Sequence, residues 1–288
     1  MQVKSPTKGG QKSASRAKVT ADFVMTDYQS PFADLVWSDQ PGSEKVAAGL
    51  HQGGVILFSW PLGRLVAGVG EILTADEQAR ADRFLFDRDQ VAFSMARAGL
   101  RTVLGQWLEI SPQSVRLASG EHGKPGLDLS QVNSPLQFNL SHSGGLALLA
   151  LSLVGPLGVD IERIPTDKPP PWKVAQRCFT ARERQALAQG TEQQRGQTFY
   201  RLWTRKEAVV KLLGEGLQAP LQAFNVSADN QTACETLLPL GNQLGRERCW
   251  LQSVGIAEGF VAALACCEQP ERMIHRPLEL RAGCKTQS

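Results

Sequence analysis

The segment FYRLWTRKEAVVKLLGEGL, from Phe199 to Leu217, reads as one helix with its own stop signal. Good helix formers without a proline run as far as the first glycine, and the two glycines supply the left-handed backbone freedom that a C-cap needs. Phe199, Trp203, Glu207 and Lys211 stand four residues apart and therefore fall along one helix face. The spacing predicts that an aromatic, buried face continues into a carboxylate and an ammonium group.

A surface ion pair is the alternative interpretation of this helix. A glutamate four residues before a lysine is a common exposed pair, worth about 0.2–0.5 kcal/mol. Glu207 would then lie in solvent, and a separate core face would come from four aliphatic residues, Leu202, Val209, Leu212 and Leu213. This helix alone does not distinguish the two interpretations, and the other carboxylates of the chain are needed to decide between them.

Length and composition describe an ordinary globular chain. Its 288 residues are 42% apolar and 20% charged, which is enough for one large core or two smaller ones. No apolar run approaches the roughly 20 residues that a membrane helix needs. We therefore expect a soluble protein with no membrane partner.

Positive charge is concentrated at the N-terminus. The formal net charge is +3, but residues 1–20 hold five basic side chains and no acid, so the remainder carries −2. This distribution gives little support for a nucleic-acid-binding fold, which places its positive charge on a structured face. Residues 1–20 offer almost nothing to bury and are predicted to form a disordered basic tail. The same composition fits a transit peptide or the remnant of an expression tag.

The cysteine pattern gives no sign of a disulfide framework or a metal site. Six cysteines lie at positions 178, 234, 249, 266, 267 and 284, with no CxxC and no Cys/His metal spacing. The first residues contain no secretory apolar segment. We expect reduced thiols and a cytoplasmic protein.

Short strands and helices are predicted to alternate before the central part of the chain. A buried strand is expected at 55–60. A helix is predicted to start at Thr74, with Glu77 completing a capping box, and a longer helix at 90–108. Further along the chain, Thr180 and Glu183 form a second predicted capping box within the helical region 172–190. The Ser-Gly-Gly sequence at 143–145 is typical of a hairpin turn between two strands.

A proline-rich stretch near the middle of the chain predicts that the protein has two halves. A proline-rich connector opens the C-terminal half, 165–268, and separates it from the N-terminal half, 45–164. Residues 269–288 are polar and are expected to form a flexible tail. The segments 139–151 and 254–265 both read as a tight turn leading into a strand of small apolar residues, which hints at an internal duplication.

Two carboxylates stand close together near the middle of the chain. In the predicted strand 157–162, Asp160 and Glu162 point to one side, while Val159 and Ile161 pack on the other. Convergent carboxylates suit a hard divalent cation such as Mg²⁺. A half-exposed edge strand explains the pattern equally well.

Basic residues that suit a phosphate-rich ligand precede these carboxylates. Lys124 lies in a loop, 120–126, whose glycines let the backbone approach a ligand, although a plain turn accounts for the same glycines. The preceding helical region carries arginines at positions 80, 83, 88, 97 and 101. Most of these are expected to be solvated, but their density would suit a polyphosphate.

Four motifs, in this order, resemble those of the surfactin-type 4′-phosphopantetheinyl transferases. They are GKP at 123–125, FNLSHS at 138–143, GVDIE at 158–162 and WTRKEAVVK at 203–211. The resemblance extends over roughly residues 50–268. It implies an α+β fold in which two similar α/β halves form an intramolecular pseudo-dimer, with the active site between them, in a monomeric protein.

The resemblance also implies a reaction. Coenzyme A would give its phosphopantetheine arm to a serine of an apo acyl or peptidyl carrier protein, releasing adenosine 3′,5′-bisphosphate. Asp160, Glu162 and Glu207 would hold Mg²⁺ against the pyrophosphate. Glu207 is also expected to be the general base, and Lys211 to stabilise charge on a phosphate oxygen.

The nucleotide end of coenzyme A needs its own contacts. The resemblance assigns them to Arg80, Lys124, Ser141 and His142. Ala92 stands where many relatives carry a basic residue for the 3′-phosphate, and Arg88 or Arg97 is the candidate replacement.

Two other functions fit the sequence less well. A carrier-protein or coenzyme A binding module without turnover would be favoured if a carboxylate or Lys211 were missing, and none is. A phosphotransferase that uses a nucleoside triphosphate is disfavoured, because no GxxxxGK[ST] motif occurs. The sequence does not identify the acceptor, but carriers of this kind are usually acidic, so arginines 177, 182 and 184 form a candidate docking patch.

Overall fold

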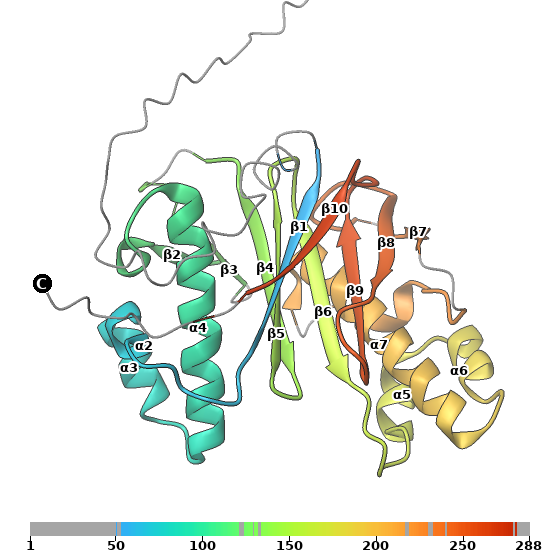
Figure 1. The fold of residues 1–288 in the computed structure, drawn as a ribbon. Coiled ribbons are helices and arrows are strands. Elements are labelled where there is room, and N and C mark those ends of the chain that lie inside the picture. Colours follow the sequence, from blue (N-terminus) through green and yellow to red (C-terminus); the bar gives the residue numbers. More distant parts are fainter. Residues whose placement is uncertain are drawn as a thin grey trace, which may run out of the picture. The chain divides into compact units, whose positions relative to one another are not determined.

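Two four-stranded sheets, each backed by one long helix, form this α+β protein (Figure 1). The computed structural model describes residues 50, 53–120, 124–128, 130–131, 134–216, 219–229, 233–239, 241–278 and 280. All of them fall within one contact unit. The predicted basic tail, 1–20, lies outside the described residues.

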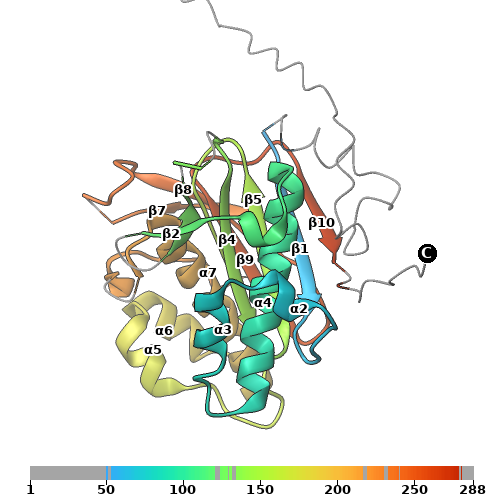
Figure 2. The ribbon, with the colours of Figure 1, turned by 90° about the vertical axis from the view of Figure 1, so that its left-hand side faces the viewer.

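The first sheet has the strand order β10-β1-β5-β4 and packs against helix α4. Strands β4 and β5 form the predicted hairpin, and its two turn residues, Gly144 and Gly145, both have positive φ angles. The short helices α2 and α3 lie beside α4 (Figure 2). The elements of this part are β1 (Val55–Pro61), α2 (Val69–Ile72), α3 (Ala75–Ala81), α4 (Asp87–Leu108), η1 (Pro112–Ser114), β2 (Leu117–Ser119), β3 (Pro125–Leu127), β4 (Gln137–Ser143) and β5 (Leu146–Ser152).

The second sheet has the order β6-β9-β8-β7 and packs against helix α7. Helix α7 contains the segment from which the sequence analysis began, and it ends before Gly214, whose φ of 76° confirms the predicted C-cap. The elements of this part are β6 (Leu157–Arg163), α5 (Trp172–Cys178), α6 (Ala181–Leu187), α7 (Glu192–Leu213), η3 (Leu221–Ala223), β7 (Ala233–Leu237), β8 (Arg248–Val254) and β9 (Phe260–Cys266). They are followed in the chain by β10 (Met273–Pro277), which belongs to the first sheet.

Capping boxes fix where the helices begin. Thr74 accepts a hydrogen bond from the backbone of Glu77, whose side chain in turn accepts one from the backbone of Thr74. The equivalent reciprocal bonds link Thr180 and Glu183 at the start of α6. Each box satisfies amide groups that would otherwise lack partners at a helix N-terminus. Both boxes are therefore confirmed.

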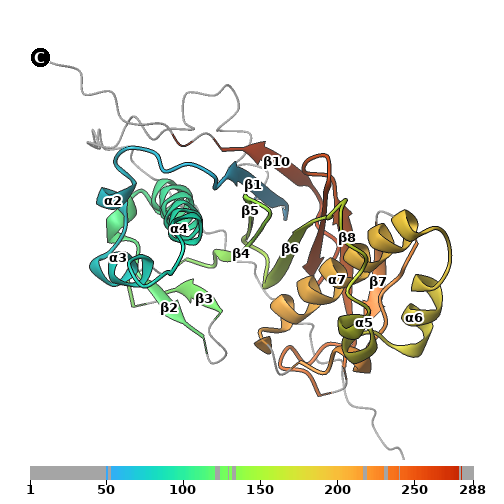
Figure 3. The ribbon, with the colours of Figure 1, turned by 90° about the horizontal axis from the view of Figure 1, so that it is seen from below.

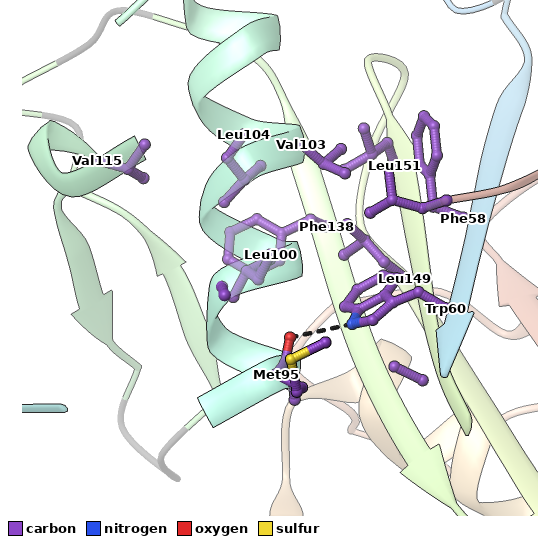
Figure 4. Close-up of a cluster of buried hydrophobic side chains, with 14 of the residues drawn as sticks. Phe58, Trp60, Met95, Leu100, Val103, Leu104, Val115, Phe138, Leu149 and Leu151 are labelled. Carbon is purple, nitrogen blue, oxygen red and sulfur yellow. Dashed lines mark hydrogen bonds between the residues drawn. The ribbon is translucent and has the colours of Figure 1, made fainter. Parts of the chain in front are cut away.

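Apolar side chains gather in three buried clusters. One lies between the first sheet and α4, where the Trp60 indole donates a hydrogen bond to the carbonyl of Met95 (3.1 Å; Figure 4). A second lies between the second sheet and α7. The third joins the two sheets to each other and includes Leu57, Leu148, Val159 and Leu264. The sheets therefore lie between the two long helices, as the view from below shows (Figure 3).

Two strands lie outside the halves that the sequence analysis assigned to them. Strand β6 was placed in the N-terminal half, 45–164, but it pairs antiparallel with β9 and belongs to the second sheet. Residues 269–288 were expected to form a flexible tail, but β10 pairs parallel with β1, and Leu278 beyond it is buried. Both expectations are wrong for the same physical reason, because the sequence of a strand indicates which of its faces is buried but not which distant strand pairs with it.

Two further observations concern the broad class of protein. Among the described residues, no helix combines the length and apolarity needed to cross a membrane. The five cysteines in that part of the chain are free thiols. Cys284 lies outside it.

Candidate active site

Strand β6 and helix α7 come into direct backbone contact at Gly158. A Cβ atom at this position would lie 2.1 Å from the carbonyl oxygen of Ala208 and 2.3 Å from the amide nitrogen of Leu212. Only glycine allows this approach, because such distances are far below any van der Waals contact. The carboxylates of β6 are consequently brought onto the face of α7 that carries Glu207 and Lys211.

An ion pair between Asp160 and Lys211 lies at the centre of this contact. Lys211 Nζ is 2.7 Å from Asp160 Oδ1 and also donates to the backbone carbonyl of Val159 (3.1 Å). The Ser141 hydroxyl, from β4, donates to the same Asp160 oxygen at 2.8 Å. The other oxygen, Asp160 Oδ2, is buried and has no hydrogen-bond partner in the described part of the chain. An anionic oxygen in that position is free to bind a cation.

Glu162 lies two residues further along β6, on the same face as predicted. The Ser143 hydroxyl donates to its Oε2 at 2.5 Å. Burial raises the pKa of Glu162; the hydrogen bond from Ser143 opposes this, and the negative charge of Asp160 adds to it. The carboxylate is thus held from β4, while the Trp203 side chain of α7 also favours its ionised form.

Glu207 is half-buried and belongs to the same electrostatic cluster. Burial raises its pKa most, and the charges of Asp160 and Glu162 raise it further, while Lys211 opposes them. The alternative interpretation of an exposed pair between Glu207 and Lys211 is wrong, because Lys211 reaches across to Asp160 instead. The predicted stripe is confirmed at its other end, where the rings of Phe199 and Trp203 stack 6.4 Å apart.

The outer edge of β6 is covered by side chains of β4, which accept hydrogen bonds from its backbone; the two strands do not pair as neighbours in one sheet. The backbone amide of Val159 donates to Asn139 Oδ1 (2.8 Å), and that of Arg163 donates to Ser143 Oγ (3.3 Å). β6 is therefore an edge strand of its own sheet, but the alternative interpretation of a half-exposed strand is wrong, because residues 157–161 are buried. Its edge is nevertheless protected, and the motif of β4 is positioned directly beside the carboxylates.

The four residues expected to bind the nucleotide occupy different surroundings. Ser141 is in the site. His142, next to it, is accessible to solvent, and incomplete solvation of its ring, followed by the charge of Lys211, lowers its pKa. Lys124 donates to two backbone carbonyls, described below. Arg80 lies apart from this cluster, with its guanidinium 5.1 Å from the centre of the Phe93 ring.

Two contacts near the site were not predicted from the sequence. Ser143 holds Glu162 and was detectable, because residues two apart in a strand share a face and Ser143 follows Ser141 by two positions. Glu183, buried in α6, forms a 3.0 Å ion pair with Lys206. Lys206 lies off the helix stripe that carries Lys211, and its fully buried position agrees with a structural role.

A cation site is only partly assembled. In the described part of the chain, no group of three or more His, Cys, Asp or Glu side chains is gathered closely enough to hold a metal ion. The donors present are nevertheless carboxylate oxygens. Besides burial, the charge of Asp160 raises the pKa values of Glu162 and Glu207, and Asp160 Oδ2 lacks a partner among the described residues. Such an inventory fits a hard cation such as Mg²⁺ and not a soft metal.

Two similar halves, with a cluster of carboxylates and a lysine on the second, form the arrangement that the sequence resemblance implies for a phosphopantetheinyl transferase. Two family models agree with this division. The N-terminal model of the 4′-phosphopantetheinyl transferases matches residues 61–153, and that of the 4′-phosphopantetheinyl transferase superfamily matches residues 156–265. The gap between them coincides with the turn before β6.

Several proteins are similar to this chain over much of their length. The putative 4′-phosphopantetheinyl transferase slr0495 of Synechocystis is 33% identical over 70% of this chain and 82% of its own. The 4′-phosphopantetheinyl transferase HetI of Nostoc is 38% identical over 54% and 65%, and Sfp of Bacillus subtilis is 26% identical over 69% and 84%. The chain belongs to the 4′-phosphopantetheinyl transferase family, whose members use coenzyme A as a substrate.

Proposed function

We propose that this protein transfers the 4′-phosphopantetheine group of coenzyme A to a serine of an apo acyl or peptidyl carrier protein. The observation that carries the proposal is the Asp160–Lys211 ion pair, with Glu162 and Glu207 beside it, at the place where β4, β6 and α7 meet. The alternative of a binding module without turnover would require a missing carboxylate or lysine, and all four groups are present.

Asp160, Glu162 and Glu207 would hold Mg²⁺. When bound, this ion would neutralise negative charge on the pyrophosphate of coenzyme A. The orphan oxygen of Asp160 supports the assignment, since its burial without a partner is unfavourable unless a cation faces it. Ser141 and Ser143 keep the first two carboxylates in fixed orientations.

Glu207 would accept the proton of the carrier serine. Its pKa, raised by burial and by the charge of Asp160, makes it a stronger base than an ordinary glutamate. Lys211 would place its ammonium against a phosphate oxygen as the bond to the leaving group breaks. Because Lys211 is already held by Asp160 and a backbone carbonyl, little reorganisation is needed for that contact.

The nucleotide end of coenzyme A would be held mainly from β4. Ser141 and His142 lie on that strand beside the carboxylates, and the exposed His142 ring would meet a phosphate group. Arg80 would contribute its charge from α3, at the margin of the site. The contacts with the 3′-phosphate are left to Arg88 or Arg97, of which Arg97 lies 5.7 Å from the Phe93 ring that Arg80 also covers.

The carrier protein would dock on α5 and α6. Trp172, Lys173, Arg177 and Arg182 are exposed there, while the one glutamate of these helices, Glu183, is buried in its ion pair. An apolar ring surrounded by uncompensated positive charge suits an acidic partner. Reversing Arg177 and Arg182 to glutamate should raise the KM for carrier and leave that for coenzyme A unchanged; an unaltered carrier KM would remove this surface from the proposal.

The proposal also covers the working state of the protein. We expect a cytoplasmic monomer that binds neither nucleic acid nor membrane, because both halves of the pseudo-dimer come from one chain. Gel filtration coupled to light scattering would give the mass directly, and a stable dimer would contradict the monomer.

The decisive experiment is intact-protein mass spectrometry of an apo acyl carrier protein incubated with this protein, coenzyme A and Mg²⁺. The carrier should gain the mass of one phosphopantetheine arm. Glu207→Gln should abolish the gain, whereas Glu247→Gln, at an exposed position far along the chain, should not. If several acidic carriers stay unmodified with the wild-type protein, the binding-module alternative replaces this proposal.

A further inference from the structure

Lys124 donates hydrogen bonds to two backbone carbonyls that lie far from it in sequence. Its Nζ is 2.9 Å from the carbonyl oxygen of Leu157, at the start of β6, and 2.6 Å from that of Lys211, in the last turn of α7. Burial, followed by the charge of Lys211, lowers the pKa of Lys124 to about 8. The ammonium group is therefore directed into the protein, between two elements of the site.

The carbonyl of Lys211 is one that a helix cannot satisfy by itself. The last four carbonyls of a helix have no intrahelical donor. In α7 the cap residue Gly214 donates to Val210 (2.9 Å), and Lys124 supplies the donor for the next carbonyl along. A positive charge at this end is also favoured by the helix dipole.

The carbonyl of Leu157 lies on the outer edge of β6, two residues before that of Val159. Lys211 donates to the Val159 carbonyl with its own side chain. The two lysines are thus successive donors along one strand edge. Lys124 fixes the backbone of residue 211 to that edge, and the Lys211 side chain then reaches Asp160 from a fixed origin.

We propose that Lys124 is a positioning residue, which ties the C-terminal turn of α7 to β6 and thereby sets the location of the Lys211 ammonium. This role differs from the direct contact with coenzyme A that the family resemblance implies for Lys124. Its catalytic consequence rests on the proposed transferase function, but its structural consequence does not.

The test compares Lys124→Met with Lys168→Met, a matched change at an exposed position in the connector after β6. Three quantities are measured: the Kd for coenzyme A by calorimetry, kcat at saturating coenzyme A by carrier mass spectrometry, and hydrogen exchange of the amides at the end of α7. Lys124→Met should lower kcat by about tenfold or more, since small displacements of a catalytic group cost this much. The Kd should stay within about twofold, and exchange at 212–214 should accelerate.

The opposite pattern would overturn the proposal. A Kd for coenzyme A raised about tenfold, with kcat and amide exchange unchanged, would make Lys124 a ligand contact. Lys124→Arg keeps a cationic donor and should preserve the slow exchange; rapid exchange in that variant also counts against the role. If the wild-type protein modifies no carrier, the proposed function fails, while the exchange data still decide whether Lys124 holds α7.

Discussion

The two halves of the molecule share one framework but use it for different purposes. In each, a helix with a capping box precedes a helix of 22 residues. The capping glutamate then contacts a basic residue at the same position of the long helix: Glu77 with Arg101 at 2.6 Å, and Glu183 with Lys206 at 3.0 Å. This repetition extends the duplication that the sequence only suggested, and it shows that the framework is stabilised separately from the site.

The halves differ on the face where strand and long helix meet. Phe58 and Trp60 hold the positions in β1 that Asp160 and Glu162 hold in β6. Buried rings therefore fill the first half, and carboxylates occupy the second. The lesson is that one copy of the framework carries the chemistry, while the other is packed as a hydrophobic core.

In each half a glycine allows the strand and the long helix to pack closely, but the two glycines lie in different elements. In the second half, Gly158 of the strand makes room for the backbone of α7. In the first half, Gly99 of α4 makes room for Trp60, whose ring would lie 2.3 Å from a Cβ at that position. Four pairs of matched substitutions, one in each half, test whether the halves differ in this way.

The largest expected effect is on the buried ion pairs. Lys206→Met should lower the free energy of unfolding by about 3–5 kcal/mol, because it leaves the carboxylate of Glu183 buried and unpaired. Arg101→Met should cost less, since Glu77 is slightly more exposed and retains Arg97 at 3.8 Å. Urea titrations of the two variants measure the difference, and equal losses would contradict it.

The next effect is on catalysis. Lys211→Met should lower kcat/KM by about 10²–10³-fold, as expected for removal of a group that stabilises transition-state charge. Gln106 has the same position in α4, so Gln106→Met should leave kcat/KM within about twofold. A comparable loss in both variants, measured by carrier mass spectrometry, would mean that the first half also contributes to the chemistry.

A smaller effect is expected from the two glycines. Gly158→Ala and Gly99→Ala should each destabilise the protein by about 1–3 kcal/mol through overpacking. Only Gly158→Ala should also reduce kcat in the remaining folded protein, because it separates Asp160 from Lys211. Thermal unfolding and turnover of the same samples distinguish the two effects; full activity in Gly158→Ala would exclude the strand–helix contact as a determinant of the site.

The smallest effect concerns two threonines of the long helices. Thr102 Oγ1 is buried without a hydrogen-bond partner in the described part of the chain, so Thr102→Val should be neutral or stabilise the protein by up to about 1 kcal/mol. Thr204 is equally buried, but its hydroxyl donates to the carbonyl of Arg201 at 3.2 Å. Thr204→Val should therefore destabilise by about 0.5–1.5 kcal/mol, and chemical denaturation of both variants tests the sign.

Local patterns predicted the elements that carry the site. The four-residue spacing on α7, the two-residue spacing on β6 and the capping boxes each depend on contacts within one element, and the structure contains all of them. The sequence also predicted that Asp160, Glu162 and Glu207 would share an environment. Their roles toward a metal ion remain a prediction.

Long-range pairing could not be predicted in the same way. The partners of β6 and β10 lie about 100 and 200 residues away in sequence, and neither strand has a periodicity that specifies its neighbour. The same limit applies to Lys124, whose two carbonyl partners are backbone groups and leave no trace in side-chain type. The type of side chain at position 124 suggested a contact with a ligand, because side-chain type alone does not show which buried acceptors lie near Lys124.

The pairing of β10 with β1 has a consequence for synthesis on the ribosome. The first sheet contains a strand that begins at Val55 and one that ends at Pro277, so its outer position is filled only after nearly the whole chain has been translated. Until then, the emerging N-terminal segment presents β1 with one bare edge, which is open to pairing with other nascent chains. Closing so long a loop also slows the final step of folding. One edge of β1 therefore lacks its partner strand until residues 273–277 have been synthesised.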